Sequence, residues 1–265
     1  MSRALWVHIL PSAVSPESFR GGLVVVIDVL RASTTIATAL SNGASYVQIC
    51  SCAQAAVIAR RELRGGTQEQ SSALLGGERG GVIIEGFDLG NSPLDYTPER
   101  VAGRPIFFTT TNGTAAAEHA KLASTVVFGA IVNAEAIAAY ALEYAGDVHL
   151  LCAGTRGNIS RDDLIGAGLI AAAIFAGQAK SLTGARPGVE RLVAAAGDGI
   201  GIALEMGESA RRAGIEAALR ETIGGRDLIA LGYDADIAAA ARLDGGLREV
   251  PVLELTTFRT NLARF

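Results

Sequence analysis

The sequence predicts an α/β fold with three α/β/α layers around a mostly parallel sheet, built from repeated strand–loop–helix units. At least four segments repeat an apolar stretch, a polar loop and an alanine-rich stretch, which is typical of a parallel sheet covered by helices. Val24–Ile27 is apolar and mostly β-branched, as expected for a strand buried on both faces. Hydrophobic residues fill 49% of the 265 positions, which is ample for a large core.

The composition of the chain limits its domain count and its partners. No linker rich in proline or serine is present, so we expect residues 1–265 to form a single α/β domain with room for two lobes. The net charge is −4 and no basic run occurs, so nucleic acid is not an expected partner. No apolar run approaches the roughly 18 residues of a membrane span, and the first residues lack a signal-peptide pattern. Three cysteines fit reduced thiols, and we expect a cytoplasmic protein without a membrane partner.

The elements begin with an expected strand at Leu5–Leu10 and a loop at Pro11–Gly22. The central strand Val24–Ile27 leads into an alanine-rich helix, which Asn42 and Gly43 should end. Further strands are expected at Tyr46–Cys50, Pro105–Phe108, Thr125–Phe128, Val148–Leu151 and Val250–Leu255. Further helices are expected at Ala53–Leu63, Ala134–Tyr144, Leu164–Ala176, Pro187–Ala196, Ile202–Leu219, Asp227–Leu231 and Ala235–Ala241, and one follows Thr114.

The end of the central strand carries the most informative polar residues. Asp28 directly follows the strand, Arg31 comes three residues later, and Ser33–Thr35 supply hydroxyls where the helix starts. Ligands of open α/β sheets bind at the carboxyl ends of strands, and helix N-termini attract anions. We therefore expect an anion site that also carries a metal-binding or catalytic carboxylate.

A second polar region is unusually dense in glycine. Gly76–Gly81 contains Glu78 and Arg79, and Gly86–Pro93 contains Asp88 together with the candidate substrate ligands Asn91 and Ser92. A flexible surface loop would explain the glycines. We favour a shaped loop whose backbone approaches a ligand, because charged residues are interspersed among those glycines.

Two more loops should reach the same edge of the sheet. Thr110–Thr114 joins a strand to a helix and could donate hydrogen bonds to phosphate, although a well-capped helix would explain it equally well. The pattern of a Walker A loop is absent. Thr155–Asp163 follows another strand, and right-handed crossovers would bring both loops to Asp28 and Arg31.

This residue set favours metal-assisted hydrolysis of a phosphate ester. Magnesium is held by one or two carboxylates, waters and substrate oxygens, and the candidate carboxylates are Asp28, Glu78, Asp88 and Asp163. Arg31 and Arg79 could clamp the anion. A nucleophilic role for Asp28 is the weaker interpretation, because residue 30 is Leu and the D-x-D pattern of haloacid-dehalogenase phosphatases is missing.

Two alternatives stay open from the residues alone. Cys152 follows a strand and could act as a thiolate nucleophile with a depressed pKa, but only three residues separate it from Arg156, which makes a short cradle for phosphate. A non-catalytic protein that binds small anions would need only the glycine loops and helix starts. Clustered carboxylates argue against that alternative, since they repel an anion unless a metal or proton intervenes.

Five motifs together resemble the 2-phosphosulfolactate phosphatase family over about residues 5 to 255. They are Asp28–Thr35, Gly77–Gly80, Gly86–Pro93, Thr110–Thr114 and Cys152–Gly157, and Asp162 and Asp163 also fit. The resemblance implies a magnesium-dependent phosphatase with an α/β fold unlike the common phosphatase folds. Its reaction would convert 2-phospho-3-sulfolactate and water to 3-sulfolactate and phosphate, a step of coenzyme M biosynthesis, or would act on a related phosphorylated small acid.

The motifs and the resemblance together give one predicted site. Its catalytic residues are Asp28, Arg31, Glu78 and Arg79; its substrate-binding residues are Asn91, Ser92, Thr110, Asn112, Gly113, Thr114, Gly154 and Thr155; its magnesium ligands are Asp28, Glu78, Asp88 and Asp163. The expected partner is a small anionic phosphate ester, and the alanine-rich helices would also allow a homodimer.

Overall fold

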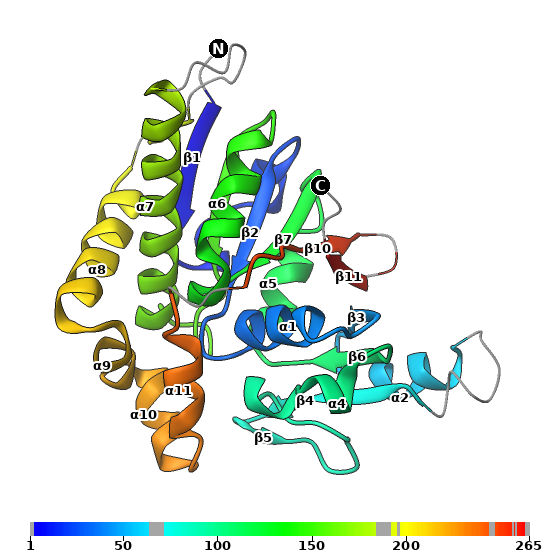
Figure 1. Cartoon of the computed structure of the whole chain (residues 1–265). Helices are drawn as coiled ribbons and strands as arrows, with labels where there is room; N and C mark the ends of the chain where they lie inside the picture. The colour runs from blue at the N-terminus through cyan, green and yellow to red at the C-terminus, as the bar shows by residue number, and fades with distance from the viewer. Residues whose placement is uncertain are drawn as a thin grey trace.

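The computed structural model describes residues 3–63, 72–183, 192–194, 197–243, 247–255, 257 and 259–262. Its framework is an eleven-stranded sheet in the order β5-β4-β6-β3-β11-β10-β7-β2-β8-β1-β9, with helices packed on it (Figure 1). The expected α/β fold with a mostly parallel sheet is confirmed. The strands fall into two parallel groups joined by one antiparallel hairpin.

The first parallel group contains β2 at its centre, flanked by β8 and β7. The second group contains β3, β6 and β4, with β5 added antiparallel to β4. The bounds of the first group are β1 Arg3–His8, β2 Leu23–Ile27, β7 Thr125–Gly129, β8 Val148–Cys152 and β9 Leu192–Ala194. Those of the second group are β3 Tyr46–Ile49, β4 Leu74–Arg79, β5 Val82–Ile83 and β6 Pro105–Thr109.

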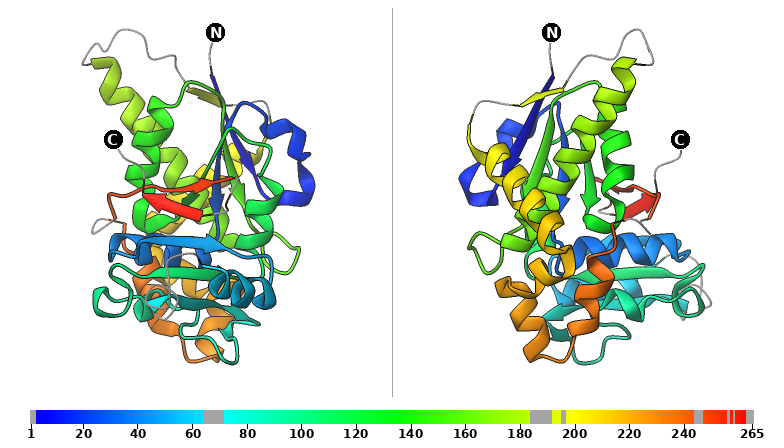
Figure 2. Two further views of the ribbon diagram at one scale, coloured as in Figure 1. Left: turned by 90° about the vertical axis from the view of Figure 1, so that its right-hand side faces the viewer. Right: turned by 60° about the vertical axis from the view of Figure 1, so that its left-hand side comes forward.

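A hairpin formed by β10 (Pro251–Glu254) and β11 (Arg259–Leu262) lies between the two groups (Figure 2). β10 pairs antiparallel with β7, and β11 pairs antiparallel with β3. The sequence indicated the first of these strands but not the second. The hairpin makes one continuous sheet from two parallel halves.

The α-helices that the structure describes are α1 Ala32–Ser41, α2 Ala53–Arg61, α4 Pro98–Val101, α5 Gly113–His119, α6 Ala134–Glu143, α7 Arg161–Thr183, α8 Gly199–Ala213, α9 Ile215–Arg220, α10 Ile223–Ala230 and α11 Asp234–Ala240. In Figure 1, α6, α7 and α8 cover one face of the first strand group, and α1 lies between the two groups. Helices α9 to α11 form a separate cluster below α7 and α8.

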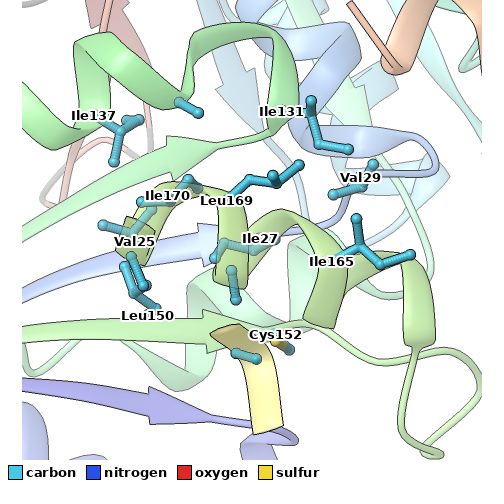
Figure 3. Packing of buried hydrophobic residues seen from close by; sticks show 14 of the residues in the cluster. Val25, Ile27, Val29, Ile131, Ile137, Leu150, Cys152, Ile165, Leu169 and Ile170 are labelled. Carbon is cyan, nitrogen blue, oxygen red and sulfur yellow. The ribbon is translucent and has the colours of Figure 1, made fainter. Parts of the chain in front are cut away.

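The alternation of side chains along β2 explains why this strand is apolar at every position. Val25 and Ile27 face a core shared with Ile165, Leu169 and other residues of α6 to α8 (Figure 3). Val24 and Val26 face the opposite core, which is built with α1 and α5. Because successive residues of a strand point to opposite faces, a strand with helices on both sides must be apolar throughout.

Helix α7 is the central helix of the first core. Arg161–Ala179 is long and apolar enough by composition to cross a membrane, whereas the sequence led us to expect no stretch of that length. The protein buries 67% of this window, as in the core helix of a globular domain. Gly168 lets α8 approach closely, since a Cβ atom there would overlap with the carbonyl oxygen of Ala203.

Two expectations on secondary structure are corrected. Gly76–Arg79 lies in strand β4 rather than in a loop. Its two glycines fit a crowded place in the sheet, since a Cβ at Gly76 would lie 2.5 Å from the Tyr96 hydroxyl. The expected helix Pro187–Ala196 is wrong at Leu192–Ala194, which forms β9 beside β1. The rest of that expected helix, residues 187–191 and 195–196, lies outside the described residues.

Candidate active site

A cavity of about 470 Å³ lies at the carboxyl ends of β2 and β6. The turn between β4 and β5 forms one wall, and α10 with the following Leu231 forms another. The two walls are in contact, since a Cβ at Gly81 would lie 2.6 Å from Leu231 Cδ1. The lining residues are Asp28, Leu30, Arg31, Glu78, Gly80, Gly81, Asn91, Thr110, Thr111, Asn112, Thr155, Arg156, Gly224, Asp227, Leu228, Ala230 and Leu231. Seven predicted site residues therefore share one cavity: Asp28, Arg31, Glu78, Asn91, Thr110, Asn112 and Thr155.

Asp28 is the buried carboxylate directly after β2. Its Oδ1 accepts a hydrogen bond from the backbone N–H of Ala32, 3.1 Å away, and the N–H of Gly113 also donates to the carboxylate. Burial raises the pKa of Asp28 to about 7, and the nearby Asp162 and Glu78 carboxylates add to the increase against these hydrogen bonds. Asp28 can therefore exchange a proton near neutral pH.

Glu78 is fixed by the backbone of two loops. Its Oε1 accepts from the Thr111 backbone N–H at 2.8 Å, and its Oε2 accepts from the Gly81 N–H at 2.8 Å. The preceding residue must be glycine, because Gly77 has a φ of +142° and a Cβ there would overlap with the carbonyl oxygen of Thr109. This close approach of β4 to β6 places Glu78 at the cavity wall.

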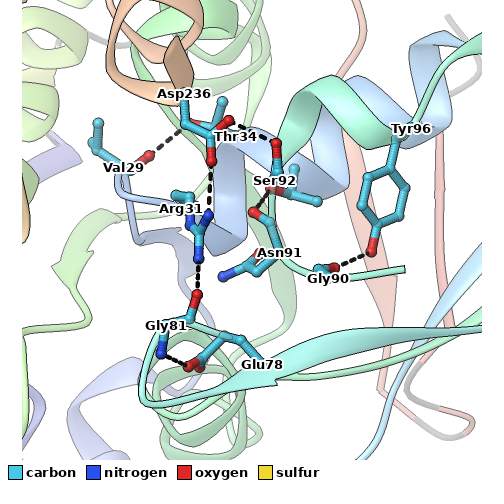
Figure 4. Close-up of polar contacts among 11 residues, drawn as sticks. Val29, Arg31, Thr34, Glu78, Gly81, Gly90, Asn91, Ser92, Tyr96 and Asp236 are labelled. Carbon is cyan, nitrogen blue, oxygen red and sulfur yellow. Dashed lines mark hydrogen bonds and ion pairs between the residues drawn. The ribbon is translucent and has the colours of Figure 1, made fainter. Parts of the chain in front are cut away.

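Arg31 lies between an acidic partner and the turn after β4 (Figure 4). Its Nη1 donates to Asp236 Oδ2 at 2.7 Å, and its Nη2 donates to the carbonyl oxygen of Gly81 at 2.6 Å. The ring of Tyr233 lies against the guanidinium, 4.5 Å from ring centroid to Cζ. The guanidinium is therefore held in a fixed orientation at the cavity.

Asn91 contributes an oxygen without a partner. Its backbone carbonyl accepts from the hydroxyl of Thr35 at 2.8 Å, which fixes the loop. Its side-chain Oδ1 is buried and has no hydrogen-bond partner among the described residues. Because buried polar atoms normally have partners, this oxygen is available to accept a hydrogen bond or to bind a cation.

The remaining polar wall comes from two loops. The backbone N–H of Thr110 donates to Thr114 Oγ1 at 3.0 Å, so Thr114 stabilises the loop from outside the cavity lining. The side chain of Asn112 accepts from the Arg156 N–H at 3.2 Å and so connects the loop after β6 to the loop after β8. Arg156 itself pairs with Asp227 of α10 at 2.9 Å.

Arg79 and Asp88 do not reach the cavity lining. Arg79 neighbours Glu78 on strand β4, where successive side chains point to opposite sides, and it donates to the hydroxyl of Thr109 at 3.0 Å. Asp88 accepts from the Leu75 N–H at 2.8 Å and pairs with Arg60 at 3.2 Å. These positions argue against the predicted catalytic role of Arg79 and against the predicted magnesium-binding role of Asp88.

Three further predicted residues lie behind the cavity wall. Asp163 accepts from the N–H groups of Val29 and Gly154, both at 2.9 Å, and therefore joins the loops after β2 and β8. Its pKa is raised well above the usual range by burial and by the neighbouring Asp162 and Asp28 carboxylates. Ser92 donates to Asp236 rather than facing the cavity, and Gly113 reaches the site through its backbone.

Cys152 has the environment of a structural thiol. It is fully buried in the core shared with α7, and it is not among the residues that line the cavity. Burial raises its pKa well above the usual value, whereas a thiolate nucleophile needs a depressed pKa. The cysteine-phosphatase alternative depends on a depressed pKa of Cys152, and the structure contradicts that expectation.

The sequence did not indicate Asp236, Tyr233 or the wall formed by α10. Asp236 is buried together with Ile237 and Ala240 on one face of α11. An aspartate on an otherwise alanine-rich, core-facing helix is the only signal that the sequence offered. It could not have identified Arg31 as the partner, because the two residues are 205 positions apart.

The oxygen donors at the cavity fit magnesium. Asp28, Glu78 and Asn91 offer two carboxylates and one amide oxygen, which are hard ligands of the kind that magnesium prefers. Among the described residues, no group of three or more His, Cys, Asp or Glu is arranged to hold an ion.

Comparisons with known proteins give one consistent result. The family model described as 2-phosphosulpholactate phosphatase matches residues 9–255. The chain is similar to a protein of Deinococcus radiodurans, with 40% identity over 243 residues that cover 90% of each chain. It is also similar to a protein of Synechococcus sp. (strain CC9605), with 38% identity over 88% of this chain and 89% of the relative. Both relatives are named probable 2-phosphosulfolactate phosphatase.

Proposed function

Because the chain belongs to the 2-phosphosulfolactate phosphatase family of phosphoric monoester hydrolases, we propose that it releases phosphate from 2-phospho-3-sulfolactate, or from a related phosphorylated small acid, in a magnesium-dependent reaction. The observation that carries the proposal is the shared cavity: the Asp28 and Glu78 carboxylates lie in it with the Arg31 guanidinium. Carboxylates and a cation in one cavity suit a metal-bound phosphate ester better than a free anion.

Asp28, Glu78 and the unpartnered Asn91 oxygen would hold the magnesium ion. When bound there, magnesium would neutralise phosphate charge and polarise the phosphoryl group. In the absence of the ion, the two carboxylates would repel an anionic ester. Substrate affinity should therefore depend on magnesium as strongly as turnover does.

Arg31 is the residue that we assign to the phosphate group. Asp236 and Gly81 occupy two of the five N–H groups of its guanidinium, and among the described residues no acceptor is found for the other three. Charge-assisted N–H bonds to phosphate oxygens are short and strong. Arg31 can therefore bind the ester while its protein contacts stay in place.

Asp28 can also take up a proton during hydrolysis. Water that attacks phosphorus must lose a proton, and a group with a pKa near 7 accepts one efficiently at neutral pH. Burial of the carboxylate supplies this pKa, while the Ala32 and Gly113 N–H groups keep its oxygens oriented. This pKa belongs to the site without a metal ion, and a magnesium ion bound to Asp28 would lower it, so proton transfer and magnesium binding are alternative roles for this carboxylate.

The experiment that tests the proposal measures phosphate release from 2-phosphosulfolactate with magnesium and with EDTA. We expect release that EDTA abolishes and that added magnesium restores. Asp28→Asn should lose this activity, whereas Asp88→Asn should keep it, since Asp88 lies outside the cavity lining. Release that EDTA does not change would contradict the metal role, and no release from a panel of phosphorylated acids would favour an anion-binding protein.

A further inference from the structure

Asp236 is almost completely buried at the beginning of α11, with 1% of its surface exposed. Both of its carboxylate oxygens are used: Oδ2 accepts from Arg31 Nη1 at 2.7 Å, and Oδ1 accepts from the Ser92 hydroxyl at 2.6 Å (Figure 4). Asp236 therefore connects α11 with the loop after β2 and with the Gly86–Pro93 loop.

The Arg31–Asp236 pair is shielded from water. The side chains are 3% and 2% exposed, so salt in solution screens their attraction only weakly. A buried ion pair is nevertheless weak support for stability, because desolvation of both charges offsets the attraction. The geometry of the pair indicates a role in orientation instead.

Three contacts together define the plane and rotation of the Arg31 guanidinium. Asp236 binds one terminal nitrogen, the Gly81 carbonyl binds the other, and the Tyr233 ring covers one face. Two of these three contacts come from the segment that holds α11. Without Asp236, the guanidinium would keep only the Gly81 carbonyl as a polar partner among the described residues.

We propose that Asp236 is a positioning residue, which acts through Arg31 to orient the guanidinium for the phosphate group of the substrate. This inference rests on the proposed function, because it takes Arg31 as the phosphate ligand. Groups that bind developing charge work best when they are preorganised, so that no reorientation is needed during the reaction. Asp236 supplies that preorganisation from α11, which comes after all the cavity-lining residues in the sequence.

The test is a double-mutant cycle between positions 236 and 31. We expect Asp236→Asn to lower kcat/KM by about 10- to 100-fold, because an amide loses the charge that fixes Arg31. In an Arg31→Ala background, the same change should alter kcat/KM by less than about 2-fold, since no guanidinium remains to be oriented. Equal losses in both backgrounds would overturn the proposal and assign Asp236 a structural role.

A matched control lies on the same helix. Asp234 has an exposed side chain and pairs with Arg220 at 3.6 Å, so Asp234→Asn should leave kcat/KM unchanged. Asp236→Glu should recover part of the lost activity, since it restores the charge. Melting temperatures of all variants, with assays well below them, separate loss of orientation from loss of folding. Wild-type kcat/KM in Asp236→Asn would also overturn the proposal.

A binding measurement separates this proposal from the proposed function. The affinity for inorganic phosphate, measured by calorimetry, should fall in Asp236→Asn and should not fall further when Arg31 is already Ala. If the wild-type protein binds phosphate in this pattern but hydrolyses no ester, the proposed function fails while the role of Asp236 stands. If hydrolysis occurs and phosphate affinity does not depend on Asp236, the positioning role is wrong.

Discussion

The backbone of Gly113 lies against the carboxylate of Asp28, so that a Cβ atom at position 113 would be only 3.0 Å from Asp28 Oδ2. The N–H of Gly113 also donates to this carboxylate. The loop after β6 therefore meets the loop after β2 at Asp28, the carboxyl group whose pKa is raised to about 7 by burial. Glycine at this position gives Asp28 both its space and one of its hydrogen bonds.

Gly113→Ala should displace Asp28 and lower kcat/KM by about 10-fold or more, because small misplacements of reacting groups are costly. The added methyl group would also lie 2.8 Å from the Ala32 Cβ, so we expect about 1–3 kcal/mol of destabilisation. Ala115→Ser on the exposed side of α5 is the matched control. Steady-state kinetics and urea unfolding of both variants check this prediction, which an unaffected kcat/KM for Gly113→Ala would refute.

Arg31→Ala and Arg79→Ala form an informative pair, since the sequence indicated both arginines. Arg31 lines the cavity, whereas Arg79 does not. We expect Arg31→Ala to lower kcat/KM by about 10²- to 10³-fold and Arg79→Ala to change it by less than about 3-fold. Circular dichroism establishes that both variants fold. Similar losses in the two variants would contradict this assignment.

The stability of the Asp28→Asn variant, measured relative to wild type, should increase as the pH rises. The folded-state pKa of about 7 lies above the ordinary value of 3.8, so the folded protein binds the extra proton between these pH values. Wild-type stability in EDTA therefore falls as the pH rises from about 4 to 7, and the Asn variant lacks this contribution. Between pH 5 and pH 8, the stability of the variant relative to wild type should increase by about 2–3 kcal/mol. Urea unfolding in EDTA measures it, and a difference independent of pH would disprove the raised pKa.

Thiol reagents should leave the activity intact. Cys152 and Cys50 are buried, whereas Cys52 is exposed, so mild alkylation should modify Cys52 alone. Mass spectrometry should find one adduct, and the modified protein should retain most of its phosphate release. Inhibition that follows modification of Cys152 would restore the cysteine nucleophile as a hypothesis.

The contact between α7 and α8 predicts opposite effects for two glycines. Gly168→Ala should destabilise the protein by about 3 kcal/mol, because the new methyl group would overlap with the Ala203 carbonyl. Gly201→Ala on α8 meets no atom within 4 Å and should stabilise by about 0.5–1 kcal/mol through helix propensity. Free energies of unfolding from urea titrations should therefore shift in opposite directions.

The sequence predicted the parallel sheet because repeated apolar stretches such as Val24–Ile27 carry their own signal. It also indicated most of the polar cavity wall, since the carboxyl ends of parallel strands share one edge. Arg79 lies outside the cavity lining for a local reason: the glycine-rich pattern of Gly76–Arg79 predicts a loop, whereas in strand β4 the side chains of Glu78 and Arg79 point to opposite sides. The Arg31–Asp236 pair depends on how distant segments pack, and no local pattern reports that.

The hairpin β10–β11 also has a consequence for biosynthesis. Among the described strands, only β10 and β11 pair with the facing edges of β7 and β3. These two strands leave the ribosome after all the other strands that the structure describes. Until then, the nascent chain carries two half-sheets with open backbone edges, which are templates for pairing with other chains. Chains truncated before residue 251 should therefore aggregate or bind chaperones, even though every residue that lines the cavity has already been synthesised.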